Sequence, residues 1–292
     1  MQQAVNCISC GENRAVPVCL KNSYQVVRCS GCGLIYVDPM PSESEICDLY
    51  RQGDLVEESV LEEMGDGGFV TKPSWKIKEF SEIIRQIGKL TAPGRILDVG
   101  SLWGLFMELA QEAGWETYGI EPWNSAVEYC RNKLGLKVTQ GTLTDADFTP
   151  GYFDAVVMLD VLEHCPNPRS ELRRVSRVLK DGGIICVLSP NVEGLFPVAS
   201  KWLHRLSGQS WAYLIPPFHL YDFSPSTLGR ILTDEGFQII QINYLGLDTR
   251  IQINRKDFTL RTAAKKTLSF VGRNLSMGER MAVYACKQDK HT

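Results

Sequence analysis

The stretch that most constrains the fold is residues 94–121, GRILDVGSLWGLFMELAQEAGWETYGIE. It opens with an apolar run, followed by a turn that contains Gly100 and Gly104 and by an amphipathic stretch that ends near Ala113. A second apolar run ends on an acid, Glu121. Strand, tight turn, helix, strand and acid are the layout of a nucleoside-binding βαβ unit, because glycines let a ligand approach the backbone and the helix start offers free N–H groups. The acid can accept hydrogen bonds from both ribose hydroxyls.

Length and charge limit what surrounds this unit. The chain has 292 residues, enough for one large domain and an accessory module. Its formal net charge of −3 gives no overall attraction to nucleic acid or to anionic membranes. The first residues lack a secretory pattern, and no apolar run reaches the roughly 20 residues that span a bilayer. We therefore expect a cytoplasmic protein without a transmembrane segment, whose thiols stay reduced.

Two cysteine pairs, Cys7 with Cys10 and Cys29 with Cys32, have C-x2-C spacing and are separated by eighteen residues. Each pair makes a tight turn that presents two thiolates, and two such turns close a tetrahedral zinc site. Four thiolates fill the coordination shell, so the predicted zinc is structural. It would stabilise a zinc-ribbon-like module over residues 1–40, which is too small to fold on its own core.

Residues 41–92 are expected to form a helical linker or lid before the main domain. Ser42 and Glu45 have the spacing of a capping box for a first helix, and residues 65–68, GDGG, mark a flexible break. A second helix is predicted over Ser74–Leu90, because its apolar residues repeat at helical spacing.

The main domain, residues 93–292, alternates strand-like and helix-like patterns. The predicted strands are Ile96–Gly100, Thr117–Glu121, Lys137–Gln140, Phe153–Asp160, Gly183–Ser189, Phe237–Tyr244 and Met281–Lys287. The predicted helices lie near 104–113, 124–134, 168–180 and 225–235. This alternation predicts an α/β fold with a parallel sheet covered on both faces.

An ordered set of motifs then carries a resemblance to class I S-adenosylmethionine-dependent methyltransferases over about residues 75–290. The motifs are LDVG…G at Leu97–Gly104, IEP at 120–122, FDAVVMLDVLEHCPNP at 153–168, LKDGGIICVLSPN at 179–191 and FHLYDFSPSTLGRILTDEGF at 218–237. The resemblance implies a seven-stranded Rossmann-like sheet whose last strand is antiparallel to the rest. With its cysteine module, the chain is similar to enzymes of sugar, polysaccharide and natural-product pathways, including deoxysugar C-methyltransferases.

The resemblance also assigns cofactor-binding positions. Asp98 and Gly100 would lie near the methionine part of S-adenosylmethionine, and Gly104 would open the following helix. Glu121 would hold the ribose hydroxyls. The positions expected around the adenine and along the pocket edge are Thr142, Leu143, Leu159 and Asp160.

One position departs from the family pattern. The turn usually has a glycine two residues after Gly100, and this chain has Leu102. Leucine resists a positive φ and adds bulk near the ligand. Either the turn keeps a permitted backbone conformation with the leucine side chain turned away, or cofactor binding is impaired; the first alternative is preferred.

Methyl transfer to oxygen or nitrogen often needs a base that takes the proton of the acceptor. His164 is the first candidate, because it can titrate near neutral pH and lies in the cluster Asp160-Val-Leu-Glu163-His164 at the end of the predicted fourth strand. A nearby carboxylate could orient it and raise its pKa. The alternative is a structural loop histidine. In quinone-pathway O-methyltransferases a similar E-x-x-E-H stretch binds a divalent metal. The first acid here is aspartate, so Mg²⁺ is the weaker alternative.

A second candidate base is His219, in the segment Phe218–Tyr221, which resembles a substrate-facing stretch of the sugar-modifying relatives. The alternative is that this segment only packs the next helix. An apolar insertion at about 191–224 is expected to be a substrate-covering lid, with a helical hairpin or contact with a lipid-linked substrate or membrane as alternatives.

Charge is unevenly distributed along the chain. Residues 43–66 are rich in acids, and residues 250–280 carry eight Lys/Arg against two acids. Both stretches are typical of solvated faces. The basic stretch has a second interpretation, contact with a phosphorylated or otherwise anionic acceptor.

The sequence thus predicts a methyltransferase that uses S-adenosylmethionine to methylate a hydroxyl of a sugar, a glycan precursor or a secondary metabolite. Deoxysugar C-methylation, RNA methylation and a non-catalytic cofactor-binding role remain as alternatives. The cysteine module has little Lys/Arg and the chain lacks an obvious base-flipping motif, so no nucleic-acid partner is expected. The acceptor and the oligomeric state stay open.

Overall fold

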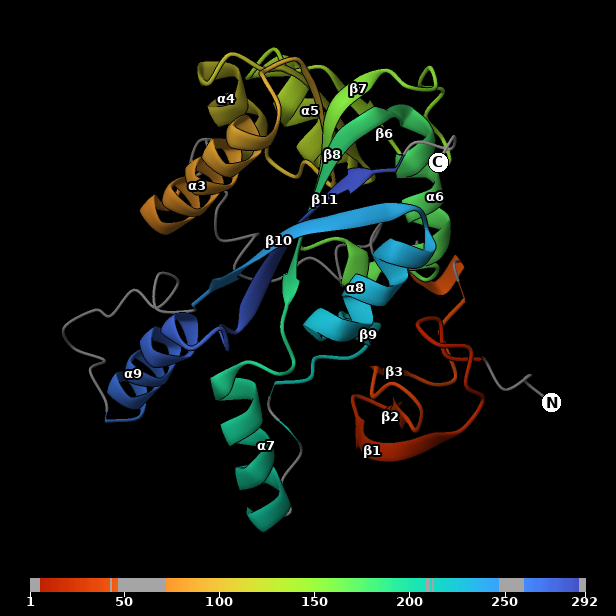
Figure 1. The fold of residues 1–292 in the computed structure, drawn as a ribbon, viewed down its shortest axis with the longest axis vertical. Helices are drawn as coiled ribbons and strands as arrows, with labels where there is room; N and C mark the ends of the chain where they lie inside the picture. Colours follow the sequence, from red (N-terminus) through yellow and green to blue (C-terminus); the bar gives the residue numbers. More distant parts are fainter. Residues whose placement is uncertain are drawn as a thin grey trace.

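A computed structural model describes residues 6–42, 44–46, 72–207, 211, 213–246 and 260–288. Its main body is a seven-stranded sheet in the order β10-β11-β8-β7-β4-β5-β6 (Figure 1). The strands are β4 (Arg95–Val99), β5 (Glu116–Glu121), β6 (Val138–Gln140), β7 (Phe153–Leu159), β8 (Leu179–Pro190), β10 (Phe237–Leu245) and β11 (Arg280–Lys287). Strand β11 runs antiparallel to both β8 and β10, while β4 to β8 pair in parallel. The predicted seven-stranded sheet with an antiparallel last strand is confirmed.

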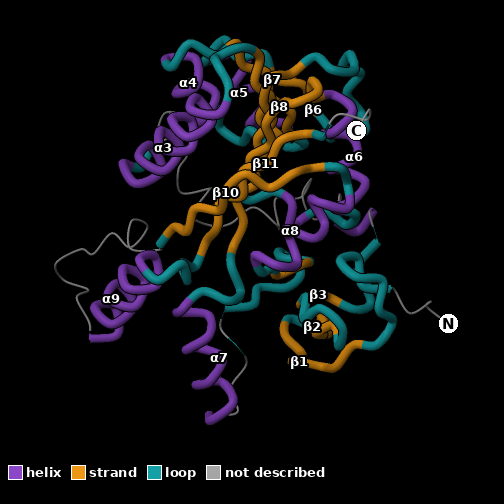
Figure 2. Tube along the Cα trace, viewed as in Figure 1, coloured by secondary structure: helices purple, strands orange, loops and turns teal. Residues whose placement is uncertain are grey.

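Helices cover both faces of this sheet (Figure 2). They are α3 (Ser74–Leu90), α4 (Leu105–Glu112), α5 (Asn124–Asn132), α6 (Pro168–Val178) and α8 (Pro225–Asp234). Side chains alternate along a strand, so Ala155 and Val157 of β7 join a core with α3 and α4. Val156 and Met158 join the opposite core, with α6 and α8. The helix predicted over Ser74–Leu90 has those bounds in the structure.

The cysteine module forms a second, four-stranded sheet that is shared with the main domain. Its strands are β1 (Ala15–Lys21), β2 (Tyr24–Cys29), β3 (Ile35–Val37) and β9 (Tyr221–Asp222), in that order. Strand β9 comes from the segment that follows the apolar insertion, and it pairs antiparallel with β3. Neither β1 nor β9 was predicted from the sequence.

The insertion after β8 contains α7 (Leu195–Ser207), which packs against α9 (Leu260–Asn274). Figure 1 shows both helices projecting beyond the edge of the sheet. Among the described residues, no helix is both long and apolar enough to cross a bilayer. The predicted capping box is present: Ser42 and Glu45 exchange backbone-to-side-chain hydrogen bonds of 2.7 and 3.2 Å.

Several sequence predictions lie outside the described residues. The break at 65–68 and most of the acidic stretch 43–66 belong to this group. Most of the helix predicted after Ser42 and the part of the basic stretch before residue 260 also lie outside the described residues.

Candidate functional site

The turn after β4 has the backbone that the cofactor motif requires. Gly100 and Gly104 have φ values of +76° and +78°. A Cβ added at Gly100 would lie 2.5 Å from Val161 Cγ2, and one at Gly104 would lie 2.5 Å from Leu136 Cδ1. Both glycines are therefore needed for conformation and for space. Val161 follows β7, so the turn after β4 touches the loop that leads to His164.

Leu102 takes the left-handed conformation that a glycine would take, with φ +45°. Its N–H donates to Glu121 Oε2 at 2.9 Å, and its carbonyl accepts from Cys130 Sγ at 3.3 Å. The structure thus places Leu102 in the left-handed region that a glycine adopts more readily, and unimpaired cofactor binding stays a prediction. Hydrogen bonds to its N–H and to its carbonyl hold the leucine in this conformation.

Glu121 is buried at the end of β5, where the motif places the ribose-binding acid. Its second oxygen accepts from the N–H of Trp123 at 2.9 Å. Burial raises the pKa of Glu121, and the two N–H donors from Leu102 and Trp123 partly oppose that rise. A carboxylate oxygen can accept more than one hydrogen bond, so both oxygens retain acceptor capacity.

Asp98 lies next to Glu121 across the sheet, near the end of β4. It is buried, and burial together with the charge of Glu121 raises the pKa of Asp98 to about 8. At the end of β6, the N–H and hydroxyl of Thr142 both donate to Asp145, at 2.8 and 2.9 Å. Leu143 is buried beside them. Leu159 closes β7, so all the predicted cofactor residues lie at the carboxyl edge of the parallel strands or in the turns that follow.

A second cluster lies at the same edge, after β7. Side-chain ligand atoms of Glu163, His164 and His219 lie within 4.8 Å of one another. Glu163 and His164 belong to a short 3-10 turn, Leu162–His164, and the two histidine rings are 5.0 Å apart between centroids. The structure therefore brings together both histidines that the sequence predicted as candidate bases.

His164 has a fixed tautomer. Its Nδ1 lies within hydrogen-bonding distance of the carbonyl of Phe218, and a carbonyl can only accept, so Nδ1 carries the proton and Nε2 the lone pair. Burial and the neighbouring His219 lower the pKa of His164 to about 3. His164 is therefore neutral at physiological pH, and it ties the turn after β7 to the segment that holds His219.

His219 has the opposite electrostatic environment. Its Nδ1 lies 3.7 Å from Asp222 Oδ1, which is an ion-pair distance rather than a hydrogen bond. Burial alone would lower the pKa of His219, but the carboxylates of Asp222, Glu163 and Asp160 outweigh burial and raise it. His219 thus takes up a proton more readily than an ordinary histidine.

Glu163 is fully buried, and neither of its carboxylate oxygens makes a hydrogen bond within the described residues. Burial, followed by the charge of Asp160, raises the pKa of Glu163 to about 7. A carboxyl group in such a place can hold or release a proton near neutral pH.

Asp160 has a φ of +56° and its carboxylate is paired with Arg280. Arg280 is itself 2% exposed and is also paired with Glu79 of α3. The guanidinium therefore joins α3, β11 and the turn after β7. A nearby carboxylate was predicted to orient His164, and in the structure the carboxylate of Asp160 is engaged by this cation.

Three residues that the sequence analysis did not assign to the site complete it: Glu79, Asp222 and Arg280. Asp222 is three residues after His219. Arg280 is 120 residues from Asp160 and 201 from Glu79, so no local pattern could have paired them.

The four cysteines form a separate cluster in the N-terminal module, with all Sγ atoms within 4.8 Å of one another. Cys7 and Cys32 are 3.5 Å apart between Sγ atoms, as are Cys10 and Cys29. Zinc–sulfur bonds of about 2.3 Å in a tetrahedron put sulfur atoms about 3.8 Å apart, so the donor set fits four-coordinate zinc. The N–H of Gly31 points at Cys29 Sγ at 3.3 Å, as a thiolate ligand requires.

Comparisons with known proteins agree with this geometry. A family model described as a methyltransferase domain matches residues 74–242. A ubiquinone biosynthesis O-methyltransferase from Methylococcus capsulatus is 28% identical over 163 residues, which cover 52% of this chain and 66% of that relative. Phosphoethanolamine N-methyltransferase 2 of Haemonchus contortus, solved with S-adenosyl-L-methionine, has a TM-score of 0.56 at 15% identity and covers 88% of this chain and 62% of that chain.

A SAM-dependent methyltransferase from Archaeoglobus fulgidus has a TM-score of 0.50 at 21% identity, covering 72% of this chain and 94% of that one. These structural likenesses concern the fold, whereas the family match spans more than half of the chain. The chain belongs to the methyltransferase-domain family, with the class I Rossmann-like fold of S-adenosylmethionine-dependent methyltransferases.

Proposed function

We propose that this protein transfers the methyl group of S-adenosylmethionine to a hydroxyl of a small molecule, with sugars, glycan precursors and secondary metabolites as the acceptor classes. The observation that carries the proposal is the Glu163–His164–His219 cluster beside the cofactor turn, in which Glu163 is buried and both histidines are half-buried. Val161 links the two, because it packs against Gly100 and lies two residues before Glu163. The relatives named as O-methyltransferases support oxygen as the acceptor atom.

The residues after β4 and β5 bind the cofactor in this proposal. Glu121 accepts hydrogen bonds from the ribose hydroxyls, and the left-handed turn at Gly100 and Leu102 lets the cofactor approach the backbone closely. When bound, S-adenosylmethionine supplies an electrophilic methyl group, so the protein has only to position the acceptor and remove its proton.

His219 is the proposed base. Its Nδ1 faces Asp222, which leaves Nε2 for the proton of the acceptor hydroxyl. The neighbouring carboxylates that raise the pKa of His219 also stabilise the imidazolium that forms. Nε2 would take the proton of the acceptor oxygen while that oxygen bonds to the methyl group, the bond from the methyl group to the sulfonium sulfur breaks, and S-adenosylhomocysteine leaves.

His164 and Asp160 have positioning roles in this mechanism. His164 is neutral and its Nδ1–H holds the carbonyl of Phe218, next to His219. Asp160 is paired with Arg280, which keeps the turn after β7 in place. The four cysteines would hold a structural zinc ion, and their four thiolates would fill its coordination shell.

A metal at Glu163, His164 and His219 is the alternative use of this cluster, since one carboxylate and two imidazoles are a known donor set. Magnesium prefers oxygen ligands, and Asp160 is already paired with Arg280, so magnesium is the weaker choice. A chelator that stops turnover while the cysteine-bound zinc is retained would favour this alternative.

The test is a labelled-methyl assay with sugar, glycan-precursor and phenolic acceptors. We expect His219→Ala to lower kcat by about 10²- to 10⁴-fold, because a general base contributes on that order. Binding of S-adenosylhomocysteine, measured by calorimetry, should stay unchanged.

Asp222→Asn provides the matched pH test. The base must be unprotonated, so activity rises with pH through the raised pKa of His219; removing the Asp222 charge should move that rise to lower pH. No binding of the cofactor product, or methyl transfer that survives His219→Ala unchanged, would refute the proposal.

A further inference from the structure

The cysteine module is built into the segment that carries His219. Strand β3 pairs with β9 in the register Ile35↔Asp222 and Tyr36↔Tyr221. One step earlier, the N–H of Val37 donates to the carbonyl of Leu220 at 3.0 Å. The pairing therefore fixes the backbone on the C-terminal side of His219, including its partner Asp222.

The same module holds the stretch that precedes His219. At the turn between β1 and β2, Lys21 Nζ donates to the carbonyl of Leu214 and Asn22 Nδ2 donates to that of Pro216 at 2.8 Å. A small hydrophobic cluster adds packing; its buried members are Val26, Ile35, Val192, Trp211 and Leu214. Within residues 211–222, contacts from the module thus lie on both sides of His219.

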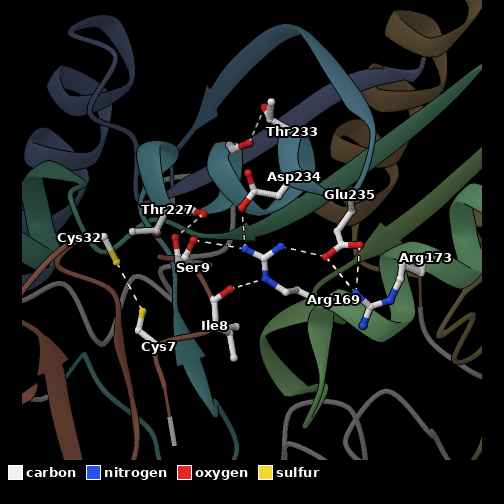
Figure 3. Close-up of polar contacts among 11 residues, drawn as sticks. Cys7, Ile8, Ser9, Cys32, Arg169, Arg173, Thr227, Thr233, Asp234 and Glu235 are labelled. Atoms are coloured by element: carbon white, nitrogen blue, oxygen red, sulfur yellow. Dashed lines mark hydrogen bonds and ion pairs between the residues drawn. The ribbon is translucent and has the colours of Figure 1, made fainter. Parts of the chain in front are cut away.

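A third contact joins the cysteine turn itself to the main domain. Figure 3 shows Arg169, at the start of α6, pointing its guanidinium between Ile8 and the end of α8. It donates to the carbonyls of Ile8 and Ser9, which lie between Cys7 and Cys10. The same guanidinium pairs with Asp234 at 2.7 Å and Glu235 at 2.8 Å.

The residues that hold Glu121 and Gly100 lie outside the module. Glu121 is held by Leu102 and Trp123, and Gly100 packs against Val161. All of these belong to the seven-stranded sheet and its turns. The module therefore contacts the segment 211–222, whereas the cofactor turn after β4 is held by residues of the seven-stranded sheet and its turns.

We propose that the cysteine module is a structural part of the acceptor site, and that Arg169 is the positioning residue that couples zinc occupancy to the conformation of residues 211–222. Zinc holds the turn at Cys7–Cys10 in place, and Arg169 joins that turn to the end of α8 through hydrogen bonds and ion pairs. Strand β3 holds β9 by pairing with it. Loss of zinc releases His219 and Asp222 and leaves the cofactor turn intact. The role of His219 in this inference rests on the proposed function, whereas the coupling of zinc to the segment does not.

The first experiment compares the full chain with and without zinc by hydrogen–deuterium exchange. The thiols are kept reduced and zinc is removed with a chelator. Peptides from 211–222 should exchange at least about tenfold faster without zinc, because β9 loses its partner strand. Peptides over 95–105 should keep their protection, and the Kd of S-adenosylhomocysteine should change less than about threefold.

The second experiment uses Arg169→Ala with Arg173→Ala as its control. Both arginines pair with Glu235, but only Arg169 also contacts Ile8 and Ser9. Arg169→Ala should release zinc to a colorimetric chelator several-fold faster and raise exchange in 211–222. Where an acceptor is known, Arg169→Ala should raise the KM for that acceptor more than it lowers kcat. Arg173→Ala should match the parent protein.

Equal zinc release and equal exchange in the two variants would overturn the role of Arg169. Unchanged protection of 211–222 after zinc removal would overturn the coupling between zinc and this segment. Loss of S-adenosylhomocysteine binding after zinc removal would overturn the claim that the effect is confined to the acceptor side. None of these readouts needs a methyl acceptor, so their failure is distinct from failure of the proposed methyl transfer.

Discussion

At the scale of single residues, Leu102 is the most informative position. A leucine in the left-handed region costs about 1–2 kcal/mol, and here the N–H and carbonyl of that residue are both hydrogen-bonded. The backbone is thus already in the conformation that the family's glycine would supply. The strain lies in the turn that we propose binds the cofactor, and binding sites are a common place for backbone strain.

We therefore expect Leu102→Gly to change the Kd of S-adenosylhomocysteine less than about threefold, measured by calorimetry. Its effect on the free energy of unfolding should be within about 1 kcal/mol, since relief of strain is offset by the greater entropy of glycine in the unfolded chain. Gly135→Ala is a control at another positive φ, with open space around the glycine. Tighter binding by tenfold or more would mean that the leucine side chain obstructs the site.

At the scale of secondary-structure elements, Arg280 joins three of them. It lies on β11, pairs with Glu79 on α3 and with Asp160 after β7, and is 2% exposed. Removing one partner of a buried ion pair leaves a charge that neither water nor a partner stabilises. The position of α3 beside the site depends on this cation.

We expect Arg280→Ala to lower the free energy of unfolding by about 3–5 kcal/mol in urea denaturation, because two carboxylates lose their buried partner. Arg85→Ala is the matched control on the exposed side of α3. It removes an ion pair with Glu82, an exposed i,i+3 pair of the kind that contributes less than about 1 kcal/mol. Similar losses in the two variants would contradict the structural role of Arg280.

The elements that the sequence predicted share one property: their signal is local. The helix Ser74–Leu90 was predicted with correct bounds because its isoleucines repeat at helical spacing. Strand β9 was missed, since two residues show no period and their partner strand lies far earlier in the chain. The same reason explains which residues of the site were predicted. The motifs placed Asp98, Glu121 and both histidines at one edge, but nothing near Asp160 in the sequence indicated Arg280.

At the scale of the whole molecule, buried titratable groups link stability to pH. The pKa values of Asp98 and Glu163 are raised to about 8 and about 7, and that of His219 is also raised. Between pH 6.5 and 8 the folded chain therefore holds protons that the unfolded chain has released. The lowered pKa of His164 opposes this trend near pH 6.5, where the unfolded histidine still carries a proton. The two carboxyl groups outweigh that one histidine, so the unfolding free energy falls as pH rises through this window.

We expect the Tm of the zinc-loaded protein without cofactor to fall from pH 6.5 to pH 8, measured by calorimetry at constant ionic strength. Each group contributes a slope of at most about 1.4 kcal/mol per pH unit. Asp98→Asn removes one of these groups and should flatten the dependence, whereas Asp147→Asn in an exposed loop should not. A Tm that rises with pH would show that these carboxyls are ionised in the folded state.

The shared strand also defines what can be exchanged between related proteins. The N-terminal forty residues look like a separable unit in the sequence, yet their last strand is completed only by Tyr221 and Asp222. A chimaera that replaces this unit alone would remove β3, so Tyr221 and Asp222 would lose their partner strand, and it would also remove Leu34 and Tyr36, which belong to the main core. The segment that contains His219 must therefore be transplanted together with the cysteine module if the hybrid is to fold.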